Sequence, residues 1–194
     1  PVTAIKNPPS VEQVIAEEKT ALAAHPHIDV ITLTANGEPT LYPDLVRLAH
    51  ELNLIKGRAK TLILSNGSGV LDPQICEALK GLDIVKFSLD SAVQKTFARI
   101  DRSGEKIDID ELVGAMAKFR REFKGELVLE ILVVKGLNDT RAEFEALNAA
   151  LNQILPARVD ISTIARPPAY PVKGVSRELL CELAQQISGV PCVI

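Results

Sequence analysis

Glu38 is the first residue of the chain whose type and position could serve chemistry. The preceding run, residues 29–35, is rich in β-branched side chains and predicts a strand. Asn36 and Gly37 end this run as turn residues do, and Pro39 favours an extended backbone at Glu38. In parallel α/β folds, ligands bind beyond the carboxyl ends of the strands. Glu38 is therefore a candidate binding residue, and a solvated carboxylate in a plain connection is the alternative.

Polar residues follow the next predicted strands as well. Asn66 comes just after the apolar run 61–64, Ser88 and Asp90 end the run that starts at Ile84, and Asn138 follows the run 127–134. Parallel strands place their carboxyl ends at one edge of a sheet. We therefore expect one cleft at that edge, surrounded by Asn36, Glu38, Asn66, Ser88 and Asn138.

Lys86 offers a different chemistry. If its side chain points into a barrel with Asp90 nearby, it could act as the nucleophile of a Schiff-base aldolase. However, Lys86 lies four residues before Asp90, roughly 13 Å below the strand end at the rise of a β-strand. That depth is unfavourable for a catalytic lysine.

The elements that must position these residues alternate between strand and helix. We expect strands over 29–35, 61–64, 84–89, 127–134 and 159–164, and the start of a sixth within 190–194. Helical patterns fall between them, over roughly 11–24, 43–57, 73–80, a short segment ending near Ile100, 108–123, and two segments capped by Thr140 and Ser176. Ser10 with Gln13 and Thr140 with Glu143 have the spacing of capping boxes.

Regular alternation of this kind gives parallel strands joined by right-handed helical crossovers. We therefore predict an α/β fold in which residues 1–194 form one domain. Its architecture is a partial (β/α) barrel, an open arc of parallel strands with the helices outside, and a doubly wound sheet is the alternative.

The strands differ in polarity between their two faces. Lys86, Ser88 and Asp90 share one face, Val85 and Phe87 the other, and the later strands alternate similarly. Helices cover apolar faces, so the polar faces should line the interior of the arc. Charged groups there are costly unless they are hydrated or paired. We expect a hydrated or ligand-filled interior, with a polar core whose side chains satisfy one another as the alternative.

Composition excludes several classes of protein. The chain has 194 residues, 46% of them hydrophobic, and a net charge of −3, which argues against non-specific binding to nucleic acids or acidic membranes. No apolar run approaches the ~18 residues of a membrane span, and residues 1–3 show no signal-peptide pattern. Cytoplasmic localisation is the expectation. The three cysteines, Cys76, Cys181 and Cys192, form no ligand cluster and are expected to be separate thiols.

Residues 36–41, Asn-Gly-Glu-Pro-Thr-Leu, resemble the Gly-Gly-Glu motif of the radical S-adenosylmethionine (SAM) superfamily. The resemblance implies that the Glu38 carboxylate and backbone oxygens beside Asn36, Gly37 and Pro39 bind the methionyl ammonium of SAM. An ammonium requires several oxygen acceptors, one of them ionised, so this role suits the residues. Asn36 stands where the motif usually has its first glycine.

The resemblance extends along the chain and implies further contacts with SAM. Ser88 and Asp90 resemble the ribose site of the superfamily, and Asn66 belongs to its Asn-Gly strand ending. Residues 133–139, which include Asn138, resemble the strand ending whose backbone approaches the adenine. Residues 166–169, Arg-Pro-Pro-Ala, resemble a subgroup of Fe–S oxidoreductases akin to wyosine-type tRNA-modifying enzymes, which implies tRNA as a candidate partner.

One motif of the superfamily does not occur in residues 1–194. Its C-x-x-x-C-x-x-C sequence holds a [4Fe–4S] cluster on the loop after the first strand, whereas Pro1 precedes what would be the first helix. The resemblance therefore implies a core lacking its N-terminal strand and cluster loop, inactive by itself, whose parent protein makes a 5′-deoxyadenosyl radical. The unpaired edge at 29–35 could pair with another chain, giving a dimer or aggregate. A non-catalytic binding module is a further alternative.

Overall fold

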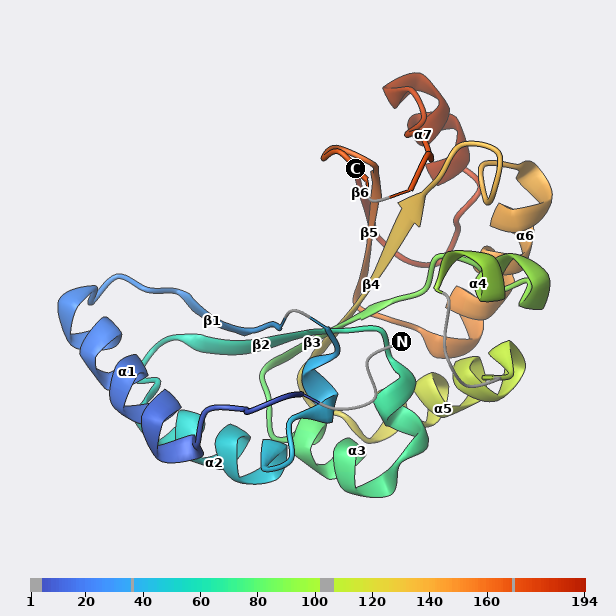
Figure 1. Ribbon diagram of the computed structural model, residues 1–194. Helices are drawn as coiled ribbons and strands as arrows, with labels where there is room; N and C mark the ends of the chain where they lie inside the picture. Colours follow the sequence, from blue (N-terminus) through green and yellow to red (C-terminus); the bar gives the residue numbers. More distant parts are fainter. Residues whose placement is uncertain (1–4, 36, 102–106, 169) are drawn as a thin grey trace.

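The computed structural model describes residues 5–35, 37–101, 107–168 and 170–194. Six parallel strands form one sheet in which the spatial order follows the chain order. The sheet curves into an arc and does not close, which confirms the predicted open α/β architecture (Figure 1). The strands are β1 (Val30–Leu33), β2 (Lys60–Ser65), β3 (Ile84–Ser88), β4 (Glu126–Val133), β5 (Arg158–Thr163) and β6 (Cys192–Val193).

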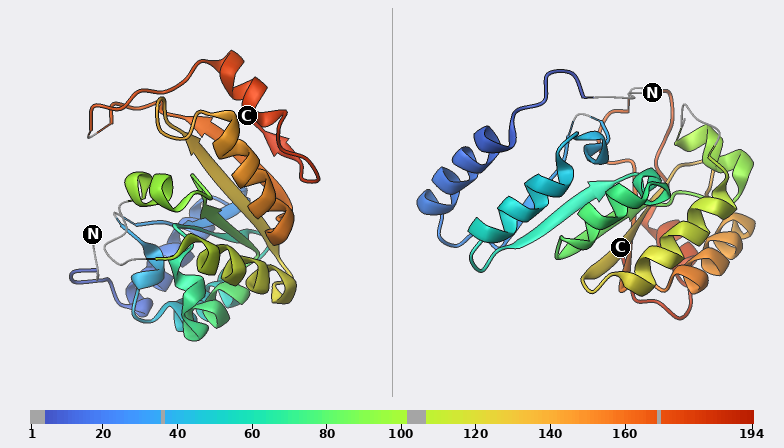
Figure 2. Two further views of the ribbon diagram at one scale, coloured as in Figure 1. Left: turned by 90° about the vertical axis from the view of Figure 1, so that its right-hand side faces the viewer. Right: turned by 90° about the horizontal axis from the view of Figure 1, so that it is seen from below.

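Helices connect the strands and cover the convex face of the sheet (Figures 1 and 2). Helix α4 is the first of two helices between β3 and β4, and it lies apart from the row of covering helices (Figure 2, left). The α-helices are α1 (Val11–Ala24), α2 (Leu45–Ile55), α3 (Pro73–Lys80), α4 (Gln94–Ile100), α5 (Ile109–Glu122), α6 (Arg141–Ile154) and α7 (Arg177–Ala184).

The hydrophobic core lies between the sheet and these helices. Val85 and Phe87 of β3 are fully buried there, whereas Lys86 and Ser88 of the same strand are only partly buried on the concave face. The same alternation holds in β5, where Val159 is fully buried and Asp160 is not. Period-2 patterning thus assigns the faces of these strands as predicted.

Capping residues begin most helices where the sequence predicts. Ser10 and Gln13 form the expected capping box of α1, with bonds of 2.9 and 3.3 Å. The box expected at α6 is only half formed. Thr140 accepts the N–H of Glu143 at 3.3 Å, but the Glu143 carboxylate does not return to the backbone of Thr140. It accepts hydrogen bonds from two hydroxyls in the segment after β3 instead.

Two short 3₁₀-helices and the C-terminal region differ from the predicted elements. The 3₁₀-helices η1 (Pro39–Leu41) and η2 (Ser68–Leu71) lie within segments expected to be loops, directly after the Glu38 and Asn66 positions. Helix α7, the segment capped by Ser176, ends at Ala184. Ile187 lies beyond the helix and is also buried. The anticipated sixth strand forms, but only over two residues.

Strand β1 lies at one edge of the sheet, as expected for residues 29–35, and β6 lies at the other. Val30 of β1 is exposed. Pairing of this edge with a second chain stays a prediction. In the described residues, no helix has both the length and the apolar character that crossing a bilayer requires.

Candidate cofactor-binding site at the carboxyl edge of the sheet

The Glu38 carboxylate joins the loops that follow β1 and β2. One oxygen, Oε1, accepts the backbone N–H of Thr40 at 3.0 Å and its hydroxyl at 2.8 Å. The other, Oε2, accepts the backbone N–H of Asn66 at 2.8 Å. Gly37, with φ of 145°, supplies a backbone conformation that few other residues adopt readily. Asn36 lies outside the described residues.

These bonds hold Glu38 in one orientation and leave it able to accept more. A carboxylate offers about four lone-pair directions, and three are used here. The remaining direction, on the half-buried carboxylate, could receive a cationic donor. Thr40, which the sequence did not single out as a site residue, is buried and provides two of the three bonds.

Asn66 and Gly67 form the turn after β2. The Asn66 side chain accepts the N–H of Ser68 at 2.9 Å, and the backbone N–H of Asn66 donates to the Glu38 carboxylate. Gly67 has φ of 80°, and a Cβ there would lie 2.2 Å from Cε of Met116. The positive φ favours glycine at this position, and the turn presents the backbone N–H of Asn66 to Glu38.

Ser88 and Asp90 line a second part of the edge. Both contribute to a cavity of about 640 Å³ beyond the carboxyl ends of β3, β4 and β5. The Ser88 hydroxyl forms no side-chain hydrogen bond with any other described residue. Asp90 is buried, and its Oδ1 accepts the N–H of Leu132 at 2.8 Å. Burial raises the pKa of Asp90 to about 6, despite that bond.

Asn138 is a buried residue that joins the strand ends beside this cavity. Its side chain is fully buried, accepts the N–H of Val134 at 2.7 Å, and donates to the carbonyls of Asp90 and Leu132 at 2.6 and 2.9 Å. It therefore does not open into a cleft, in contrast to the geometry expected from sequence. Its amide locks the ends of β3 and β4 together.

A buried carboxylate anchors the segment between Asp90 and α4. Glu143 of α6 accepts the hydroxyls of Ser91 at 2.6 Å and Thr96 at 2.5 Å. All three side chains are buried. Sequence reasoning missed this contact because its partners lie about 50 residues apart and the spacing of Glu143 from Thr140 suggested a local role.

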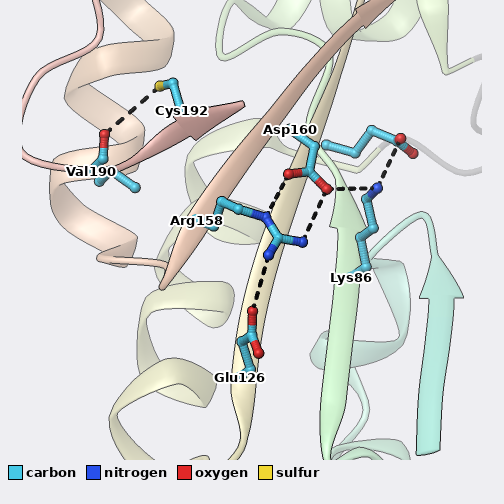
Figure 3. A network of polar contacts seen from close by, with 7 residues as sticks. Lys86, Glu126, Arg158, Asp160, Val190 and Cys192 are labelled. Carbon is cyan, nitrogen blue, oxygen red and sulfur yellow. Dashed lines mark hydrogen bonds and ion pairs between the residues drawn. The ribbon is translucent and has the colours of Figure 1, made fainter. Parts of the chain in front are cut away.

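The concave face carries a network of ion pairs (Figure 3). Nζ of Lys86 lies 3.0 Å from carboxylate oxygens of both Glu130 and Asp160. Arg158 binds the other oxygen of Asp160 at 2.7 Å and Glu126 at 3.4 Å. The charges expected on the inner face are therefore partnered with one another while remaining partly accessible.

This network opposes a Schiff-base role for Lys86. Burial alone would lower the pKa of Lys86, but hydrogen bonds with Asp160 and Glu130 outweigh it and raise the pKa. A nucleophilic lysine requires a lowered pKa, so that the amine is neutral. The aldolase alternative is therefore disfavoured.

Asp101, at the end of α4, is a second acid with a raised pKa. Burial is the main cause that raises the pKa of Asp101 to about 7, and repulsion from the Asp90 charge is the second cause. Its Oδ2 is buried without a hydrogen-bond partner. No local sequence pattern indicates that this carboxylate is buried.

The cysteines do not fit an iron–sulfur cluster. Cys76 lies on α3, Cys181 on α7 and Cys192 in β6. Within residues 5–35, 37–101, 107–168 and 170–194, no group of three or more potential ligands could hold a metal ion. Burial also raises the pKa of Cys76 and Cys192, which disfavours their thiolates.

The amino-acid sequence that builds this edge can be compared with known protein families. Residues 5–147 match the model of the radical SAM superfamily, a match that covers more than half of the chain. The chain belongs to the radical SAM superfamily. Members of this superfamily use SAM and a [4Fe–4S] cluster, and the fold described above is the one expected from the resemblance.

Two relatives by sequence illustrate the range of similarity. The chain is 43% identical over 166 residues to a UPF0026 protein of Helicobacter pylori, an alignment covering 86% of this chain and 53% of that protein. It is 28% identical over 183 residues to a UPF0026 protein of Synechocystis, covering 84% of this chain and 68% of that one. The chain thus spans about half the length of the Helicobacter relative.

Solved structures share the fold of this radical SAM chain. A radical SAM methyltransferase from Sphaerobacter thermophilus superimposes with a TM-score of 0.73 at 21% identity, over 94% of this chain and 55% of that one. A domain of pyruvate-formate lyase-activating enzyme from Bacteroides vulgatus gives 0.66 at 12% identity, over 86% and 98%. At these identities the likeness concerns the fold alone.

Proposed function

We propose that this chain is the SAM-binding core of a radical SAM enzyme, with Glu38 as the acceptor for the methionyl ammonium. The observation that carries the proposal is the Glu38 carboxylate, fixed by Asn66 and Thr40 with one acceptor direction unused. A charge-assisted hydrogen bond to an ammonium would use that direction. Pro39 and Gly37 shape the loop, and backbone oxygens beside Asn36 would complete the acceptor set.

The adenosyl part of SAM would occupy the cavity beside Ser88. The free hydroxyl of Ser88 and the second carboxylate oxygen of Asp90 suit the two hydroxyls of a ribose. Asn66 would border the passage between Glu38 and this cavity. Asn138 would act indirectly, by holding the strand ends that carry Asp90 and by positioning the nearby backbone toward the adenine.

A reduced [4Fe–4S] cluster would let bound SAM supply a 5′-deoxyadenosyl radical. The described residues do not hold that cluster, so they account for binding and orienting SAM and not for its cleavage. The resemblance also predicts a cluster segment elsewhere in the full-length protein, an inactive core without that segment, and tRNA as a candidate partner. Cytoplasmic localisation stays a prediction from the composition.

The proposal is tested by titrating SAM, adenosine and methionine separately into the protein and measuring heat. SAM should bind more tightly than either fragment, because it engages Glu38 and the cavity together. Ser88→Ala should weaken adenosine and SAM by a similar factor, while exposed Ser188→Ala should change neither. Absence of SAM binding, or equal effects of the two serine variants, would overturn the proposal.

A further inference from the structure

Two arginines line the cavity beyond β3, β4 and β5, and they come from different elements. Arg99 lies in the last turn of α4, and Arg166 lies in the loop after β5. Both are exposed. Neither guanidinium forms a salt bridge or a hydrogen bond with any residue that the structure describes. Two cationic residues that pair with no anion in the described part of the chain thus line the cavity.

The acids that line the same cavity are already engaged. Lys86 lies 3.0 Å from Glu130 and neutralises its charge, and Asp90 accepts the Leu132 N–H. In the described part of the chain, neither acid pairs with Arg99 or Arg166.

Two lysines add positive charge beside the cavity. The backbone N–H of Lys135 donates to the carbonyl of Lys173 at 2.9 Å, and both residues are exposed. Their neighbours Val134 and Val172 line the cavity. The chain as a whole carries a net charge of −3, so this gathering of cations is a local feature opposite in sign to the rest.

We propose that Arg99 and Arg166 bind an oxyanion group, a phosphate or a carboxylate, of the substrate. This inference rests on the proposed function, since it assigns the substrate side of the SAM site. Guanidinium groups present paired N–H donors that match both oxyanions. The hydroxyl of Ser162, which also lines the cavity, could donate a further hydrogen bond.

The oxyanion is not the carboxylate of SAM itself. The ammonium and carboxylate of methionine share one carbon atom, so they lie within about 4 Å of each other. Glu38 is bonded to the loop after β2, whereas Arg166 follows β5, three strands farther along the sheet. At ~4.8 Å between neighbouring strands, that separation is roughly 14 Å along the curved edge of the sheet. We therefore assign the anion at Arg166 to a compound other than SAM, and the SAM measurements in the arginine variants test that assignment.

The experiment uses inorganic phosphate and succinate as probes, each titrated into the protein at low ionic strength. Arg99→Gln and Arg166→Gln are compared with Arg121→Gln, an exposed arginine on α5 away from the cavity. Each cavity variant should weaken binding of the preferred probe about tenfold, because hydrogen bonds to charged groups are worth about that factor. Arg166→Lys should restore part of the affinity, and Arg121→Gln should change nothing.

SAM affinity is measured in the same variants and should not change. Binding of phosphate alone assigns the substrate group to a phosphate, and binding of succinate alone assigns it to a carboxylate. Failure of both probes to bind, or equal effects of all three arginine variants, would overturn the inference. Loss of SAM affinity in parallel with the probe would assign the arginines to SAM and also overturn it. The proposed function fails separately, if SAM binding does not depend on Glu38.

Discussion

The Glu38 carboxylate accepts the backbone N–H of Asn66 at 2.8 Å, which joins the loop after β1 to the loop after β2. The other carboxylate oxygen of Glu38 accepts the backbone N–H and the hydroxyl of Thr40. All three bonds come from groups of the protein itself, and they hold the Glu38 carboxylate in one orientation. Preorganisation of this kind reduces the entropy that binding must overcome.

Thr40→Val should weaken SAM binding without disrupting the fold. Valine matches threonine in shape but lacks the hydroxyl that donates to Glu38 at 2.8 Å. We expect SAM affinity to fall about threefold to tenfold, because one hydrogen bond that positions the carboxylate is lost. Calorimetry should show this loss, and Thr20→Val, on the exposed face of α1, should show none. Equal affinities of the two variants would contradict the positioning role of Thr40.

Lys86→Met should destabilise the protein. The variant leaves Glu130 unpaired and Asp160 with only Arg158, on a face that is partly shielded from water. Removing one partner from such a network costs more than an exposed pair contributes, and we expect about 1–3 kcal/mol in urea unfolding. Lys80→Met, which removes a lysine paired with Glu77 and Glu122 on the surface, is the control and should cost less.

The same lysine also tests the aldolase alternative. Because its pKa is raised, Lys86 should remain an ammonium near neutral pH and form no imine. Borohydride treatment with carbonyl compounds should leave Lys86 unmodified in mass spectra. A reduced adduct on Lys86 would revive the aldolase assignment.

Asp101 should make stability fall as pH rises from about 4 to about 7. Its folded pKa of about 7 exceeds the ordinary value of 3.8, so over this range the folded state retains a proton that the unfolded state has released. Stability then decreases with pH and levels off above the folded pKa. Asp90, with a folded pKa of about 6, acts in the same direction over a narrower range.

Asp101→Asn should remove this penalty. The variant should be more stable than the wild type at pH 8 by on the order of 2–4 kcal/mol, because each pKa unit is worth about 1.4 kcal/mol. At pH 4 the two proteins should be nearly equal, which serves as the internal control. Urea unfolding at both pH values measures the difference, and a variant less stable at pH 8 would contradict the pKa assigned to Asp101.

The sequence predicts what depends on periodicity and local capping. The strand faces of Val85–Ser88 and the capping box at Ser10 follow from the spacing of neighbouring residues, and both are confirmed. Contacts between distant segments are different. The Glu143 bonds to Ser91 and Thr96, and the buried amide of Asn138, depend on the packing of α6 and β4, which no local pattern specifies.

In the candidate site, too, local features are predictable from the sequence and contacts between distant residues are not. The position of Glu38 after a strand and the resemblance at residues 36–41 both single out this residue, but neither identifies Thr40 as its hydrogen-bond partner. No local pattern predicts that Arg99 and Arg166 line one cavity, because they are 67 positions apart and come from different elements.

The most direct test of this account is the SAM affinity of Glu38→Gln in the protein, measured by calorimetry beside Glu17→Gln on α1 and Glu51→Gln on α2. Glutamine removes the ionised acceptor for the methionyl ammonium, a bond worth ~1.5–3 kcal/mol where water is excluded. We predict that Glu38→Gln raises the dissociation constant of SAM by about 10- to 150-fold and that both controls leave it unchanged. An unchanged dissociation constant in Glu38→Gln would remove Glu38 from the site and contradict the central claim.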